Sequence, residues 1–105
     1  MPYRAQSEPE PSRDDVDQMT GTVLLEFGAA WCGHCQALQL GLQAALADKP
    51  EVRHIKVEDG KGKPLGRSFR VKLWPTLVFM RDGHVLKQVS RPSSQELEEG
   101  MSLLA

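Results

Sequence analysis

Residues 31–35 read Trp-Cys-Gly-His-Cys, and the two cysteines of this run, Cys32 and Cys35, are the only cysteines in the chain. Positions three apart share one face of a helix, so the two sulfur atoms can close into a disulfide or open into a dithiol with little backbone movement. This spacing indicates reversible thiol–disulfide exchange.

The residues around the cysteines predict a strand, a tight turn and a helix. Residues 22–27 form a short, apolar and β-branched run, typical of a central strand that is covered on both faces. Residues 28–30 supply the turn, and a helix is expected to begin at Cys32 because apolar residues recur at helical spacing after it. The expected apolar stripe comprises Leu38, Leu42, Ala45 and Leu46, with Gln36, Gln39 and Gln43 on other faces.

The helix gives the two thiols different expected roles. Cys32 would lie at the helix N-terminus, where unpaired backbone N–H groups and the positive end of the helix dipole favour a thiolate. Cys32 is therefore the expected nucleophile. Cys35 would lie one turn further in, more buried and less charged, so we expect it to attack the mixed disulfide and release the substrate.

The rest of the chain predicts further short elements. Ser12 with Asp15, and Ser93 with Glu96, fit capping boxes that open a short helix and a closing helix. The dipeptide at 82–83, Asp-Gly, predicts a hairpin turn. Strands are expected over residues 52–57, 76–80 and 85–89, and short helices over residues 14–19 and 64–69. The charged stretch at 58–63 between them is expected to be solvated.

The strand, the Trp-Cys-Gly-x-Cys run, the helix and the later Trp74-Pro75-Thr76 step together resemble the thioredoxin family. The resemblance covers roughly residues 13–105 and implies an α/β thioredoxin fold, a central mixed β-sheet flanked by helices on both faces. It also implies that Pro75 is cis, faces the dithiol across a substrate groove and keeps metals away from it. Thioredoxins usually open with a strand, which is faint or missing here.

The same resemblance gives Glu26 a catalytic role. Glu26 interrupts the apolar strand where thioredoxins commonly carry a buried acid, usually aspartate, beneath the resolving cysteine. A carboxyl group buried there can move the proton of Cys35. The alternative is a glutamate at the strand end that reaches solvent.

Gly33 and His34 lie between the cysteines, where the family tunes its redox potential. A protonated imidazole beside Cys32 favours the thiolate and the reduced form, which makes the disulfide a better oxidant. Cys-Gly-His-Cys is typical of protein disulfide isomerases (~−180 mV), whereas thioredoxins (~−270 mV) usually carry proline in place of histidine. The motif therefore predicts an oxidising couple, and the alternative is a solvent-facing histidine with little effect.

The substrate groove implied by the resemblance is lined by Trp31, Trp74, Pro75 and Thr76. Trp31 is expected to pack over the dithiol. Trp74 stands where a small or β-branched residue is usual, and its indole either forms or narrows the groove or is a simple core residue. Ser90, where many thioredoxins have glycine, is a second departure from the family.

Composition limits the chain to one small domain. With 105 residues, 40% of them hydrophobic, it can bury one modest core, and a net charge of −1 offers no basic surface for nucleic acid. No apolar stretch approaches the ~20 residues needed to span a membrane, and the N-terminus lacks a secretory pattern, so a cytoplasmic protein is expected. Residues 1–12 are proline-rich and read as a flexible N-terminal arm before a single domain at 13–105.

These features predict a thioredoxin-like protein-disulfide oxidoreductase that needs no cofactor and acts as a monomer. No metal site is expected, because His54 and His84 stand in no paired ligand spacing. Electrons would come from a thioredoxin reductase or a glutathione system, between which the sequence does not decide. The alternative is a thioredoxin-fold module that binds or assembles a client with little turnover, although a pure binding module has no need of a reactive dithiol.

Overall fold

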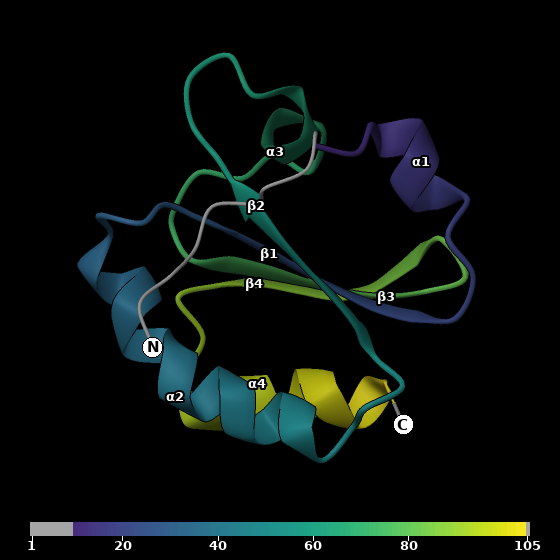
Figure 1. The fold of residues 1–105 in the computed structure, drawn as a ribbon, viewed down its shortest axis with the longest axis vertical. Helices are drawn as coiled ribbons and strands as arrows, with labels where there is room; N and C mark the ends of the chain where they lie inside the picture. Colours follow the sequence, from purple (N-terminus) through teal and green to yellow (C-terminus); the bar gives the residue numbers. More distant parts are fainter. Residues whose placement is uncertain (1–9, 105) are drawn as a thin grey trace.

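A four-stranded mixed sheet lies at the centre of the protein, in the order β2-β1-β3-β4 (Figure 1). The structure is a computed structural model that describes residues 10–104. Strand β1 (Thr22–Gly28) runs parallel to β2 (Arg53–Glu58) and antiparallel to β3 (Thr76–Arg81), which pairs antiparallel with β4 (His84–Ser90). Within the described residues no strand precedes β1, in line with the faint opening strand of the sequence.

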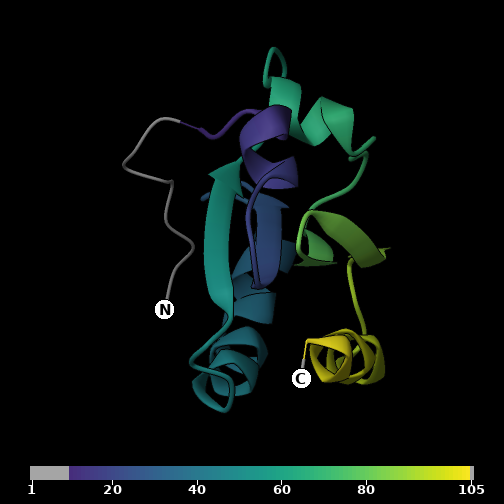
Figure 2. The same cartoon turned by 90° about the vertical axis from the view of Figure 1, so that its right-hand side faces the viewer.

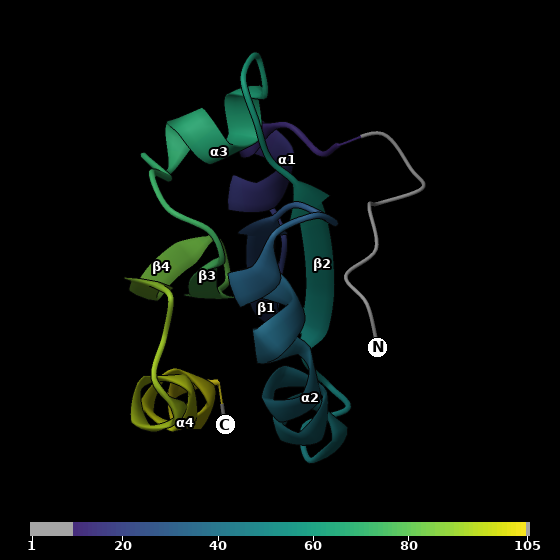
Figure 3. The same cartoon turned by 90° about the vertical axis from the view of Figure 1, so that its left-hand side faces the viewer.

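Helices cover both faces of this sheet, as Figures 2 and 3 show from its two sides. Helices α1 (Arg13–Asp17) and α3 (Pro64–Ser68) lie over one face, and α2 (Gly33–Ala47) and α4 (Ser94–Leu103) lie side by side over the other. The predicted α/β thioredoxin fold is confirmed. None of the helices within residues 10–104 is long and apolar enough to cross a membrane.

Strand β1 sorts its side chains between two apolar layers. Val23, Leu25 and Phe27 belong to the cluster that contains Val16 of α1 and Leu65 of α3, because alternate residues of a strand point to opposite faces. Leu24 belongs to the other cluster, with residues of α2 and α4. Glu26 follows Leu24 by two positions, so the pleat directs its carboxyl group toward the α2 side of the sheet.

Caps and turns hold the ends of these elements as predicted. Both capping boxes form, with the side chains of Ser12 and Ser93 accepting from the backbone N–H groups of Asp15 and Glu96. The hairpin between β3 and β4 turns at residues 82–83, both at positive φ, and the second of them is glycine. The expected helices and strands all form, with ends that differ by at most two residues from those expected.

Candidate active site

The two cysteines lie where β1 passes into α2. Cys32 is the N-cap of α2, in extended backbone conformation, and its Sγ accepts a hydrogen bond from the backbone N–H of Cys35 at 3.2 Å. Both cysteines are free thiols; Cys32 keeps 6% of its surface exposed and Cys35 none. The expected start of the helix at the first cysteine is confirmed, and the less exposed thiol is the one further along the helix.

Burial separates the two sulfur atoms chemically. Loss of solvent, the hydrogen bond with Cys32 and the negative charges of Cys32 and Glu26 raise the pKa of the Cys35 thiol to about 12, against the opposing effect of a backbone hydrogen bond with Ala29. Cys35 therefore holds its proton at neutral pH. The Cys32 sulfur instead receives an N–H group from the first turn of the helix, which is the contact that a thiolate needs.

Selective alkylation should reveal this difference. At pH 7 iodoacetamide is expected to modify Cys32 first and to leave Cys35 unmodified in the folded chain, because the thiolate is the reactive species. Peptide mass mapping after short exposures would give the two rates, with the urea-unfolded chain as the control in which both react alike. Faster modification of Cys35 in the folded protein would reverse the assignment of the two thiols.

Glu26 is fully buried, so the solvent-facing alternative is wrong. Its Oε2 accepts a hydrogen bond from Gln39 Nε2 at 2.7 Å, and its Oε1 lies 2.7 Å from His54 Nε2. The charge of Glu26 also acts on Cys35, as its effect on the thiol pKa shows. A buried, hydrogen-bonded carboxyl group thus lies within electrostatic range of the inner thiol.

Gln39 corrects a sequence prediction. The sequence pattern places it on a face other than the apolar stripe of the helix, yet it is buried and joins the site to β2. Its Nε2 donates to the Cys35 carbonyl at 2.9 Å as well as to Glu26, and its Oε1 accepts from Lys56 Nζ at 2.8 Å. A polar side chain can be buried here because both ends of its amide are hydrogen-bonded.

His54 also belongs to this site, a role that the sequence did not predict, since His54 was weighed only as a metal ligand. The His54 side chain is 23% exposed, so it connects the buried Glu26 carboxyl group to the surface. The alternation of strand β2 could have indicated this position. Ile55 and Val57 are buried in one layer, so His54 and Lys56 between them point to the other face of the sheet. Parallel pairing of this strand with β1 then brings His54 and Lys56 to the Glu26 side of the sheet.

The Trp74-Pro75 peptide bond is cis, as predicted. The Trp74 carbonyl lies 4.0 Å from Cys32 Sγ, which places the proline segment against the nucleophile. Thr76 is buried, and its hydroxyl bonds to the Leu73 carbonyl at 2.6 Å and to the Ser90 hydroxyl at 2.8 Å. Ser90 therefore helps to fix the strand that follows the proline.

Of the two tryptophans, Trp31 lies differently from the expected arrangement. Trp31 is 75% exposed, so it is not packed over the dithiol as expected. Its ring contacts the Trp74 ring edge-on, with 5.3 Å between the ring centroids. Trp74 packs against the Cys32 and Cys35 cluster. Its indole Nε1 donates to Asp59 Oδ2 at 2.9 Å, so this member of the charged stretch is not simply solvated as predicted.

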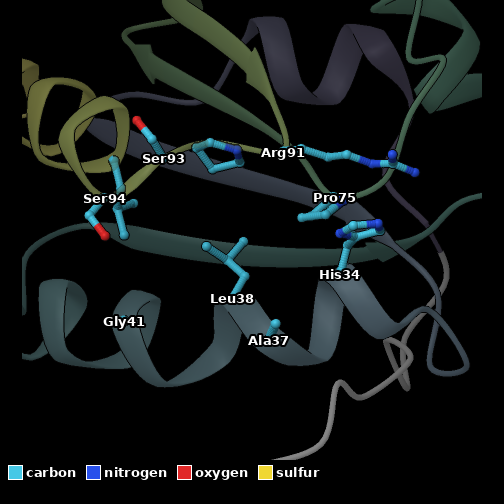
Figure 4. A pocket seen from close by; sticks show the side chains of 10 residues that line it. His34, Ala37, Leu38, Gly41, Pro75, Arg91, Ser93 and Ser94 are labelled. Carbon is cyan, nitrogen blue, oxygen red and sulfur yellow. The ribbon is translucent and has the colours of Figure 1, made fainter.

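A groove of about 270 Å³ opens beside the proline, between α2 and the connection from β4 to α4 (Figure 4). His34, Leu38 and Pro75 line one end with Arg91, and Ser93 and Leu97 lie further along. His34 is exposed and reaches toward Pro75 in the close view. One end of the groove is thus lined by the cis proline and by His34, which stands between the two cysteines in the sequence.

The chain is similar in sequence and in fold to several known proteins. A sequence profile described as thioredoxin matches residues 6–102. The structure of thioredoxin 2 from Pseudomonas aeruginosa in its reduced form shares 53% sequence identity with this chain and has a TM-score of 0.83. The match covers 99% of this chain and 96% of that one. Thioredoxin from Chlamydia trachomatis is 36% identical over 72 residues, 69% of this chain and 68% of its own length.

A longer relative also matches. Protein disulfide isomerase-like 1-4 from Arabidopsis thaliana is 39% identical over 71 residues, which are 66% of this chain. The chain spans only 12% of the length of that relative.

Proposed function

This chain belongs to the thioredoxin family, and we propose that its two cysteines exchange disulfides with protein substrates in a fixed order. It is a thiol–disulfide oxidoreductase with Cys32 and Cys35 as the redox-active pair. The observation that carries the proposed order is the difference between the thiols, since Cys35 is fully buried with a raised pKa and Cys32 lies at the helix N-cap.

The exchange begins at Cys32. The Cys32 thiolate attacks one sulfur of the substrate disulfide, a mixed disulfide forms, and the first substrate thiolate leaves. Cys35 then loses its proton and attacks Cys32 Sγ, which closes the Cys32–Cys35 disulfide and releases the second substrate thiolate. Two electrons pass from the protein to the substrate, and a dithiol reductant must return them before the next cycle.

Reduction of insulin by the reduced chain tests this function directly. With dithiothreitol as the electron donor, we expect many insulin molecules to be reduced per molecule of protein, faster than by dithiothreitol alone. Precipitation of the insulin B chain gives the rate. Consumption of no more than one disulfide per protein molecule would favour the client-binding module instead.

Glu26 is proposed to take the proton of Cys35 during the second attack. Glu26→Gln keeps the shape and the bond to Gln39 but removes the ionisable group, so resolution of the mixed disulfide should slow by roughly tenfold or more, with little change in the first attack. Stopped-flow kinetics on a model disulfide separates the two steps. Glu51→Gln, an exposed glutamate, is the matched control; equal resolution rates in all three proteins would leave Glu26 a structural residue.

His34 is proposed to move the couple toward the oxidising side, as in the isomerase-type motif. His34→Pro should make the couple more reducing by roughly 30 mV or more, a tenfold change in the exchange equilibrium, because the thiolate loses a neighbouring imidazole. Equilibration with glutathione buffers measures the potential. An unchanged or more oxidising potential would show that His34 does not tune the site.

The reductant and the cellular location remain predictions. The reductant is either a thioredoxin reductase or a glutathione system, and coupling assays with each would identify it. The cytoplasmic location likewise remains a prediction that fractionation of the source cells would check.

A further inference from the structure

Arg91 occupies an unusual backbone position beside the active site. Its φ is 50°, in the left-handed region that residues other than glycine rarely adopt. Its backbone N–H donates to the Pro75 carbonyl at 2.7 Å, which holds the β4–α4 connection against the proline segment. A bulky charged residue kept in such a conformation next to reactive groups is a candidate for a role in substrate recognition.

The side chain of Arg91 and the sulfur of Cys32 both lie close to the backbone carbonyl oxygen of Trp74. Arg91 Nε donates to the Trp74 carbonyl at 2.9 Å, and Cys32 Sγ lies 4.0 Å from the same oxygen. Figure 4 shows Arg91 extending above Pro75, with its nitrogen atoms toward the end of the groove where His34 lies. The guanidinium group is thus fixed close to the sulfur that attacks the substrate.

The guanidinium group still has donors to offer. It carries five N–H donors. Within residues 10–104 only Nε is engaged, so the two Nη groups can bind a carboxylate side by side. Such an arrangement favours an acidic side chain placed next to the reacting disulfide.

Among the residues that the structure describes, the ionisable side chains that line the groove are all basic. None of the described residues that line it is acidic, and Arg91 and His34 are its only basic groups. Asp59 binds the Trp74 indole and does not line the groove. A second hollow, which shares Gly41 and Leu97 with the groove, is lined by charges of both signs: Asp48, Lys49 and Glu98.

We propose that Arg91 determines substrate specificity by selecting disulfide-bonded peptides that carry a carboxylate next to the reacting cysteine. The proposal rests on the thiol–disulfide exchange proposed above and names the substrate class of that site. Acidic residues several positions from the cysteine gain nothing, since an extended chain advances ~3.3 Å per residue and carries them away from Arg91.

Matched peptides with a single cysteine, activated as a neutral 2-thiopyridyl disulfide, test the proposal. The Cys32 thiolate forms a mixed disulfide with the peptide sulfur and expels 2-thiopyridone, whose absorbance gives the rate; Cys35 then releases the peptide thiol. The peptides carry Glu, Gln or Lys beside the cysteine, on either side, or Glu four residues away. The reduced full chain is used, so no added reductant enters the measurement.

The Glu peptide is expected to react about two- to fivefold faster than the Gln peptide, and the Lys peptide more slowly, as for an exposed charge pair. The ratio should fall toward one in Arg91→Gln, at high salt and for the distant Glu, and Arg91→Lys should keep part of it. Arg53→Gln removes the same charge from the first residue of β2 and should retain the ratio.

The outcomes separate the two proposals. A Glu-to-Gln ratio near one in the unmodified chain, or an unchanged ratio in Arg91→Gln, would overturn the role of Arg91 while leaving thiol–disulfide exchange intact. No reaction with the neutral Gln peptide would instead overturn the proposed function, and the specificity role with it. Circular dichroism of Arg91→Gln and Arg91→Lys confirms that both are folded before the rates are compared.

Discussion

Replacing Cys32 with serine is expected to abolish insulin reduction, lowering turnover by about three orders of magnitude or more to the level of dithiothreitol alone. A serine hydroxyl at the helix N-cap carries no sulfur and so cannot form the mixed disulfide through which the exchange runs. The turbidity assay with insulin measures the loss.

Comparing Cys32→Ser with Cys35→Ser separates the roles of the two cysteines. Cys35→Ser keeps the nucleophile and loses only the buried thiol, so it should release one equivalent of substrate thiol and then stop as a mixed disulfide on Cys32. Steady turnover by Cys32→Ser, or a burst from Cys32→Ser and none from Cys35→Ser, would exchange the roles of the two cysteines.

The second large effect concerns the packing of α4 on the sheet. A Cβ at Gly100 would overlap the fully buried Phe79 ring, so Gly100→Ala should force the helix away from β3. We expect a loss of about 1–3 kcal/mol in the free energy of unfolding, although alanine is the better helix former. Chemical denaturation monitored by tryptophan fluorescence measures it.

Gly41→Ala provides a matched control with the opposite sign. Gly41 lies in the middle of α2, where the nearest atom to a new Cβ is Leu97 Cδ2 at 3.9 Å, an ordinary contact. This variant should be more stable by about 0.5–1 kcal/mol from helix propensity alone. Equal effects of the two substitutions would mean that α4 does not pack on Phe79 as described.

The sequence predicted those features that depend on neighbouring residues. The apolar run of β1, the start of α2 at Cys32 and the two capping boxes each follow from periodicity or from hydrogen bonds within one turn. The hairpin at residues 82–83 likewise depends on two residues that tolerate positive φ. The resemblance to the family added the order of the elements and the cis bond before Pro75.

Contacts between distant elements were harder to predict. Gln39 lies outside the apolar stripe predicted for its helix, and its amide turns inward because it bonds to the buried Glu26 of β1 and to Lys56 of β2. His54 and Asp59 acquire their partners through the parallel pairing of β2 with β1 and through the loop after it. No local sequence pattern predicts these contacts, because each contact joins residues of two elements that are distant in the sequence.

Arg91 illustrates the same limit at the groove. Its residue type and its place after β4 suggest an ordinary solvated cation. Its position relative to the nucleophile appears only once the Trp74 carbonyl and the β4–α4 connection are placed together. A positive φ at a residue other than glycine was the structural sign that this cation is held rather than free.

Redox titration of the unmodified chain tests the central claim most directly. In glutathione buffers of stepped potential, quenched with acid and analysed by mass spectrometry, the chain should pass between the dithiol and one internal Cys32–Cys35 disulfide, two hydrogens lighter. The transition should follow a two-electron curve, about 30 mV for each tenfold change in the ratio. Accumulation of a stable glutathione adduct on either cysteine, or a chain that stays reduced in every buffer, would contradict a redox-active pair.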